Sequence, residues 1–130
     1  MEAAIRSKVR KRAQYKCEYC QIPEAATPFI AFHAEHIIAR QHQIDDSLEN
    51  LALSCDRCNA YKGPNLSSID PTTNTIVELF HPRKESWEDH FQVQDGLVIG
   101  TTACVRARAR LLNMNAARRV QIRIDFLLGD

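Results

Sequence analysis

Two pairs of cysteines are the feature that most restricts how this chain can fold. Each pair has the spacing C-x-x-C, and 34 residues separate the pair Cys17 and Cys20 from the pair Cys55 and Cys58. Each C-x-x-C places two thiolates on a tight turn, and two such turns brought together provide the tetrahedral sulfur cage that Zn²⁺ prefers. Such a site has no open coordination position, so we predict a structural zinc. The fifth cysteine, Cys104, falls in a helical pattern and is expected to pack as a small hydrophobic side chain.

Other interpretations of the cysteines fit the chain less well. A redox pair of the thioredoxin type explains one C-x-x-C but not two, and a RING-type adaptor needs further ligands that this chain does not supply at the right spacings. A disulfide framework would leave one of the five cysteines over, and it belongs to secreted proteins. The N-terminus lacks the apolar segment of a secretory signal. The expected localisation is therefore cytoplasmic, where thiols stay reduced.

The composition is that of one ordinary soluble domain. The chain has 130 residues, of which 45% are hydrophobic and 25% are charged, and this is enough apolar material to bury one core. We therefore expect a single domain over residues 1–130. No stretch approaches the roughly 20 apolar residues that span a bilayer, so no membrane contact is expected.

The periodicity of the apolar residues predicts an α+β fold. The expected elements, in chain order, are a helix over 4–14, a strand over 29–38, a loop over 39–50, a strand over 51–54, a short helix over 59–62, strands over 75–80 and 86–93, a hairpin turn at Asp95-Gly96 before a strand over 97–99, and a helical segment from Thr101 to Gly129 that Asn113-Met114-Asn115 interrupts.

The residues between and beside the cysteine pairs resemble the HNH endonuclease family. Over residues 17–63 the chain reads CEYC, then FHAEHIIAR, then ENLALSCDRCNAYKG. The family has the same order: C-x-x-C, an acidic residue with His, an Asn before a second strand, and C-x-x-C-N-x-x-K. The resemblance implies a ββα-metal core over 17–63, stapled by the zinc, in which two strands and a helix hold one divalent cation. Around it we expect an N-terminal helix and an extension over 64–130 with an extra β-hairpin and a helical tail.

The resemblance gives four residues of this core a role. His36 is the expected general base, since an imidazole can take a proton from water near neutral pH. Glu35 offers a hard oxygen ligand to Mg²⁺ or Mn²⁺, and the amide oxygen of Asn59 is the expected second protein ligand. Asn50 is expected to support the loop so that His36 points correctly. The chain departs from the family pattern at Glu35, where Asp is commoner, at Asn59, where His also occurs, and over 39–49, which lacks the usual Pro and Gly-Gly. These departures leave Ni²⁺ and Zn²⁺ as further candidates for the catalytic cation.

The net charge of +1 hides a separation of charge along the chain. Residues 1–20 and 101–130 each carry +4, whereas residues 21–100 carry −7. An acidic centre between two basic ends suits a cation held against a polyanion, although charge runs are often only solvent-facing. The residues expected to contact nucleic acid are His33, Arg40, Lys62, Arg106 and Arg110.

Each of these expected contacts has a simpler interpretation. His33 also fits a third cation ligand, or an exposed strand residue without a role. Arg40 also fits an ordinary loop arginine, and Lys62 fits a cap at the C-terminus of a helix. The arginines of the tail fit a solvated helix face equally well.

The leading functional hypothesis is a metal-dependent endonuclease that hydrolyses DNA phosphodiester bonds and leaves 5′-phosphate and 3′-hydroxyl ends, as the resemblance implies. Double-stranded DNA is the expected partner, and a homodimer is one way for a chain with one active site to cut both strands. The alternative is a zinc-stapled DNA-binding module without catalysis, and a third hypothesis is a protein-interaction adaptor that uses the strands over 75–100. The acid and base at 35 and 36 favour the nuclease, because an acidic patch repels phosphate unless a cation intervenes.

Overall fold

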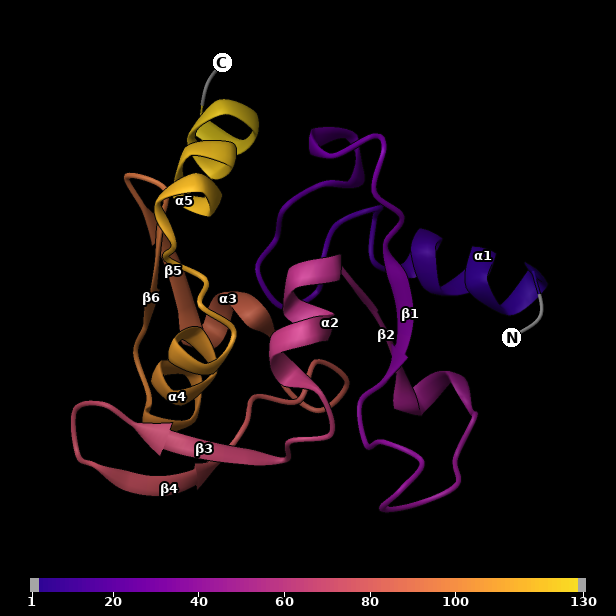
Figure 1. Cartoon of the computed structure of the whole chain (residues 1–130), viewed down its shortest axis with the longest axis horizontal. Coiled ribbons are helices and arrows are strands. Elements are labelled where there is room, and N and C mark those ends of the chain that lie inside the picture. The colour runs from indigo at the N-terminus through magenta and orange to yellow at the C-terminus, as the bar shows by residue number, and fades with distance from the viewer. Residues whose placement is uncertain (1–2, 129–130) are drawn as a thin grey trace. The chain divides into compact units, whose positions relative to one another are not determined.

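The computed structural model describes residues 3–128 and shows an α+β chain with short antiparallel strand pairs (Figure 1). Its contacts divide it into two compact units, residues 1–64 (unit 1) and residues 65–130 (unit 2). Unit 1 contains, in chain order, α1 (Ala3–Arg12), a 3-10 turn (Glu24–Ala26), β1 (His33–His36), a second 3-10 turn (Leu48–Asn50), β2 (Leu51–Ser54) and α2 (Asp56–Lys62). Unit 2 contains β3 (Ser67–Asp70), β4 (Thr75–Glu78), α3 (Trp87–His90), β5 (Phe91–Gln94), β6 (Leu97–Gly100), α4 (Ala103–Leu111), α5 (Ala117–Arg123) and a π-helical turn (Ile124–Leu128). The predicted fold class is confirmed, and a single domain over residues 1–130 stays a prediction.

Unit 1 is built around the antiparallel pair of β1 and β2. The register places Ala34 opposite Leu53 and His36 opposite Leu51. Val9 of α1 packs with Leu51 and Leu53 in a buried core, which a helix with apolar residues at four-residue spacing can cover. The predicted N-terminal helix is confirmed, slightly shorter than expected.

β1 is shorter than the strand predicted over 29–38. Only four residues pair with β2, because β2 itself has four residues. Phe29 lies outside the ladder and is 99% exposed. The ends of a strand are set by its partner, whereas the apolar run in the sequence continues past them. The prediction of strand over 29–32 and 37–38 was therefore wrong.

The helix α2 begins inside the second C-x-x-C. Cys55 occupies the N-cap position, and its Sγ accepts a hydrogen bond from the Cys58 N–H at 3.4 Å. The helix therefore starts at Asp56, earlier than the predicted residue 59. Gly63, with a φ of +49°, follows its last residue.

Unit 2 contains two β-hairpins where one was expected. β3 pairs with β4, and β5 pairs with β6. The predicted turn before β6 is confirmed, but β3 was missed because three of its four residues are polar. Residues 86–90 were predicted as the start of a strand, but Ser86 is the N-cap and Trp87–His90 form the helix α3, whose two acidic first-turn residues favour a helical turn. Trp87 of α3 stacks on Phe91, with ring centroids 4.8 Å apart.

Gly96, in the turn between β5 and β6, has no room for a larger residue. Its φ is +79°, and a Cβ built there lies 2.7 Å from Ile124 Cγ1 and 2.7 Å from the Val120 carbonyl oxygen. We predict that Gly96→Ala lowers the free energy of unfolding of unit 2 by about 1–3 kcal/mol, through strain at positive φ and overpacking. Urea denaturation followed by Trp87 fluorescence measures this change, because the only Trp lies in unit 2. Gln94→Ala, at an exposed position of β5, is the control, and equal stability of the two variants would contradict the prediction.

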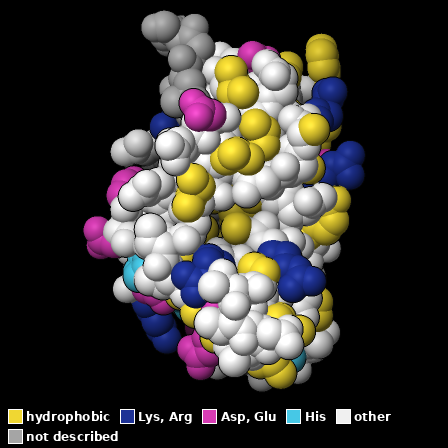
Figure 2. Space-filling view, turned by 90° about the vertical axis from the view of Figure 1, so that its left-hand side faces the viewer, with side chains coloured by type: hydrophobic (Ala, Val, Ile, Leu, Met, Phe, Trp, Pro, Cys, Tyr) yellow, Lys and Arg dark blue, Asp and Glu magenta, His cyan; other side chains and the backbone are white. Residues whose placement is uncertain are grey.

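The helical tail buries half of its six arginines. Arg108, Arg119 and Arg123 are 2%, 6% and 0% exposed. Arg108 donates to the Phe80 carbonyl, Arg119 donates to two carbonyls at the end of α4, and Arg123 Nε donates to the Gly96 carbonyl at 2.7 Å. On the face of the molecule in Figure 2, Lys and Arg side chains lie in separate groups and form no continuous band. The charge counted along the tail is therefore not all surface charge.

The predicted interruption of the tail is confirmed, because α4 ends at Leu111 and α5 begins at Ala117. Gly129, expected to end the tail, lies outside the described residues. Among residues 3–128, no helix combines the length and the apolar character needed to cross a membrane. The cytoplasmic localisation stays a prediction.

An ion pair joins the β3–β4 hairpin to α4. Arg106 donates from Nε and Nη2 to the two carboxylate oxygens of Asp70, at 2.9 and 2.8 Å. The Thr72 N–H and the Thr73 hydroxyl donate to the same carboxylate. The bond from Arg106 first, and then those from the two threonines, hold the pKa of Asp70 well below its usual range. Arg106 was expected to contact nucleic acid, and the structure gives its guanidinium a partner inside unit 2.

We predict that Asp70→Asn lowers the Tm of unit 2 by several degrees at neutral pH, and that its difference from wild type shrinks as the pH falls below about 4. The sign follows from the lowered pKa: the unfolded chain takes up the proton first, so the stability is present above the unfolded-state pKa and is lost on acidification. Thermal unfolding at several pH values measures this, with Asp89→Asn, at an exposed carboxylate of the same unit, as the control. A difference that does not change with pH would count against the prediction.

Candidate nuclease site and metal centre

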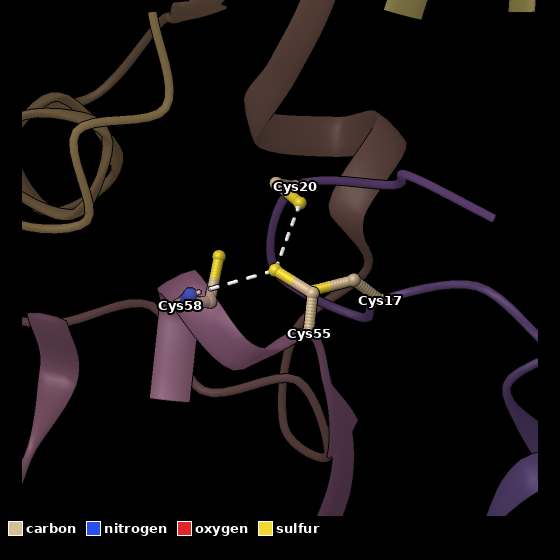
Figure 3. A group of neighbouring side chains, drawn as sticks. All are labelled: Cys17, Cys20, Cys55 and Cys58. Atoms are coloured by element: carbon tan, nitrogen blue, oxygen red, sulfur yellow. Dashed lines mark hydrogen bonds between the residues drawn. The ribbon is translucent and has the colours of Figure 1, made fainter. Parts of the chain in front are cut away.

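The four cysteines of the two C-x-x-C pairs come together in unit 1 (Figure 3). Their Sγ atoms all lie within 4.8 Å of one another, and all four side chains are buried. The sulfurs of Cys20 and Cys55 are 3.8 Å apart, and about 3.8 Å is the edge of a tetrahedron with Zn–S bonds of about 2.3 Å. The donor set and its spacing therefore fit a structural zinc held by Cys17, Cys20, Cys55 and Cys58.

The buried position of the sulfur atoms couples the cage to its cation. Burial raises the pKa of the Cys17 and Cys58 thiols, because a thiolate there loses its hydration. For Cys55 the hydrogen bond with Cys17 is the main influence, and it lowers the pKa. A divalent cation offsets the cost of burying thiolates by binding them directly. Formation of the cage and binding of zinc are therefore expected to occur together.

The first C-x-x-C turn is attached to β2. The Glu18 N–H donates to the Leu53 carbonyl at 2.9 Å, and the Leu53 N–H donates to Glu18 Oε2 at 2.7 Å. Leu53 pairs in turn with Ala34 of β1. The zinc cage therefore borders the strand pair that carries the acid and the histidine of the motif.

Glu35 of β1 is turned towards α2. The residue is 8% exposed, and the Lys62 ammonium lies 3.9 Å from Glu35 Oε2. Lys62 Nζ also donates to the carbonyl oxygens of His36 and Gly63, at 3.4 Å each. Asn59 lies three residues before Lys62, and residues at this spacing share one face of a helix. Glu35 offers a carboxylate and Asn59 an amide oxygen, and both are hard donors of the kind that Mg²⁺ and Mn²⁺ prefer.

Asn50 closes the connection between β1 and β2. Its side chain is buried and bonds both backbone groups of Ile38: Nδ2 donates to the Ile38 carbonyl at 3.1 Å, and Oδ1 accepts from the Ile38 N–H at 3.0 Å. Nδ2 also donates to the Asp45 carbonyl at 2.8 Å. These three bonds hold the loop that follows His36. That Asn50 thereby makes His36 point correctly stays a prediction.

The imidazole of His36 lies against a carboxylate that the sequence did not single out. His36 Nε2 is 2.7 Å from Asp46 Oδ1, and the His36 side chain is 21% exposed. Arg40 donates from Nη2 to both oxygens of Asp46, at 2.9 and 2.8 Å, and from Nε to Oδ1 at 3.2 Å. Asp46 was missed because it is one of two adjacent loop acids with no motif spacing. Its place beside His36 depends on the path of the loop.

The features that carry the motif all lie in the first half of the chain, from the first C-x-x-C turn to the end of α2. Residues 17–65 match the HNH endonuclease family. This confirms the recognition of the motif, and we call residues 17–65 the HNH segment. No match to the chain was found among curated proteins, and none among solved structures.

The residues expected to contact nucleic acid have different surroundings inside and outside the HNH segment. Within it, His33 is exposed at the start of β1, Arg40 is paired with Asp46, and Lys62 is only 1% exposed. In unit 2, Arg106 is paired as described above, whereas Arg110 is exposed and lines a pocket of about 410 Å³. That these five side chains contact nucleic acid stays a prediction.

Proposed function

We propose that this protein is a metal-dependent endonuclease that hydrolyses phosphodiester bonds of DNA. One observation carries the proposal: in the HNH segment, a buried carboxylate at Glu35 is followed by a partly exposed imidazole at His36. The Nε2 of this imidazole contacts the Asp46 carboxylate. A binding module has no use for a general base held in this way. Family membership of the segment supports a role on nucleic acids.

In the proposed reaction His36 takes a proton from the attacking water. Glu35 and Asn59 would hold a divalent cation by their side-chain oxygens. Such a cation, when bound, stabilises negative charge on the phosphate and on the departing oxygen. Asn50 keeps the His36 loop in place, and Lys62 compensates the charge of the buried Glu35. The products would carry 5′-phosphate and 3′-hydroxyl ends.

Two exposed residues among the expected contacts, His33 and Arg110, are the candidates for binding the DNA backbone, because the exposed Arg40 is paired with Asp46. His33 lies on the same strand as the proposed general base, and Arg110 lies in unit 2. Side chains that donate hydrogen bonds to phosphate oxygens hold DNA without reading its sequence, so we propose these two as backbone contacts. Double-stranded DNA is the proposed substrate, cut on both strands by a homodimer or by two separate visits.

Cleavage of a supercoiled plasmid tests the proposed function. Purified protein is incubated with Mg²⁺, Mn²⁺, Ni²⁺ or Zn²⁺ in turn, and we expect nicked and linear products that disappear when the cation is left out. Ligase alone should reseal the nicks, because 5′-phosphate and 3′-hydroxyl ends need no repair. Absence of cleavage with every cation, together with a retained gel shift, would instead support the DNA-binding module without catalysis.

A further inference from the structure

Residues 37–50 connect β1 to β2 (Figure 1). This connection brings the Asp46 carboxylate to the proposed general base. Asp46 and His36 are 10 residues apart in the chain. They meet because Asn50 binds the start of the connection at Ile38 and its later part at Asp45. The fold of this loop therefore places Asp46 beside His36.

The hydrogen bond decides which nitrogen of His36 is left for chemistry. A carboxylate only accepts hydrogen bonds, so the 2.7 Å contact with Asp46 Oδ1 requires a proton on His36 Nε2. In the neutral imidazole the other ring nitrogen, Nδ1, then carries the lone pair. An imidazole that is 21% exposed could otherwise turn about its side-chain bonds, and the contact with Asp46 restricts this.

Arg40 holds Asp46 in the required position. Its guanidinium donates to both carboxylate oxygens, in the two-pronged geometry that favours Arg over Lys. The hydrogen bonds from His36 first, and then from Arg40, lower the pKa of Asp46, so the carboxylate is ionised at neutral pH. An ionised carboxylate also stabilises the imidazolium that forms when His36 takes a proton.

We propose that Asp46, held by Arg40, is the positioning residue of the general base and that it makes Nδ1 of His36 the proton acceptor. This inference rests on the proposed function. It gives Arg40 a different task from the phosphate contact expected from the sequence: the guanidinium acts on the rate through Asp46 and His36, and not on the affinity for DNA. A phosphate contact and a positioning contact predict different kinetics, so the two can be separated.

Steady-state cleavage of a duplex oligonucleotide, at a saturating concentration of the cation that supports plasmid cleavage, tests the proposal with Asp46→Ala and Asp46→Asn. We expect Asp46→Ala to lower kcat by about 10–100-fold, a loss of the size seen when the hydrogen-bond partner of a metal-ligating histidine is removed. KM should not rise, because the variant removes a negative charge that repels DNA. Asp46→Asn should lose less, since its amide oxygen can still accept the Nε2–H bond while Arg40 holds it. Arg40→Ala should likewise lower kcat more than it raises KM.

Glu49→Gln is the control, because it removes one negative charge at an exposed residue of the same connection. It should keep the wild-type kcat. A kcat of Asp46→Ala within about 2-fold of wild type, while His36→Ala is inactive, would overturn the positioning role and leave the proposed function intact. If Arg40→Ala raises KM and leaves kcat unchanged, Arg40 contacts phosphate, and its proposed role in positioning Asp46 is overturned.

A measurement that does not depend on DNA cleavage separates a failure of this inference from a failure of the proposed function. In ¹⁵N-edited NMR of the histidine rings, wild type should show a His36 Nε2–H that exchanges slowly with water. This signal should be retained in Glu49→Gln and lost in Asp46→Ala, with the zinc content and fold of both variants unchanged. If the signal is the same in all three proteins, the contact does not position His36, whatever the cleavage assay shows. If no cation supports cleavage by wild type, the proposed function fails instead.

Discussion

The His36→Ala variant is expected to cleave plasmid DNA about 10²–10⁴-fold more slowly than wild type, because a positioned general base usually contributes a rate factor of this size. The reason is local: alanine cannot take a proton from water, and the variant leaves the Asp46 carboxylate without the imidazole that it contacts at 2.7 Å. The affinity for DNA should change little, because the imidazole is a small part of any contact surface. Single-turnover rates and gel shifts measure the two quantities separately.

His42→Ala is the matched control for this loss. His42 is an exposed histidine of the same β1–β2 connection, and its Nε2 lies 3.0 Å from the Pro64 carbonyl oxygen. Its replacement should therefore leave the cleavage rate close to that of wild type. Equal cleavage by wild type and His36→Ala would refute the proposed mechanism. Equal loss of cleavage in both histidine variants would mean that the substitutions disrupt the loop, so that the loss cannot be assigned to the general base.

The Cys17→Ser variant is expected to lose its zinc and unfold unit 1. A hydroxyl is a poor replacement for a thiolate ligand, and the apparent binding free energy of structural zinc, about 10–16 kcal/mol in small domains, is largely folding free energy. All three tyrosines lie in unit 1 and the only Trp lies in unit 2. Tyr fluorescence together with zinc analysis therefore follows unit 1, while Trp fluorescence follows unit 2.

Cys104→Ser is the control for this experiment. Cys104 lies in α4 of unit 2, is half-buried, and has its Sγ 3.4 Å from the Thr102 hydroxyl. Its replacement should keep one zinc per chain and the thermal transition of unit 1. If Cys17→Ser also keeps its zinc and that transition, the cage does not hold unit 1 together.

The part of the site that the sequence predicted well is the part that short-range spacing determines. One four-sulfur cage needs both C-x-x-C turns side by side, so the two motifs alone predict that the Cys17 and Cys58 sulfur atoms are close. The motif implies roles for Glu35 and Asn50, and these roles stay predictions, although the structure shows Asn50 bonded to the loop. That Glu35 and Asn59 hold a cation stays a proposal.

The features that the sequence did not predict depend on contacts between distant residues. Asp46 has no motif of its own, and only the folded path of the loop brings it to His36. Similarly, nothing in the sequence around Arg106 indicates that the Asp70 carboxylate will accept hydrogen bonds from its Nε and Nη2. The missed strand β3 and the misassigned residues 86–90 have local causes instead: three of the four residues of β3 are polar, and the acidic first turn of α3 favours a helix.

The buried arginines of unit 2 change what salt should do to any complex with DNA. A cation bound at the DNA surface displaces condensed counterions, and their release makes affinity fall with ionic strength. The guanidinium groups of Arg108 and Arg123 are buried inside the protein, so they release no counterions when DNA binds. The ionic-strength dependence of binding should therefore reflect only the cations on the surface, and it should be weaker than the number of arginines in the tail implies.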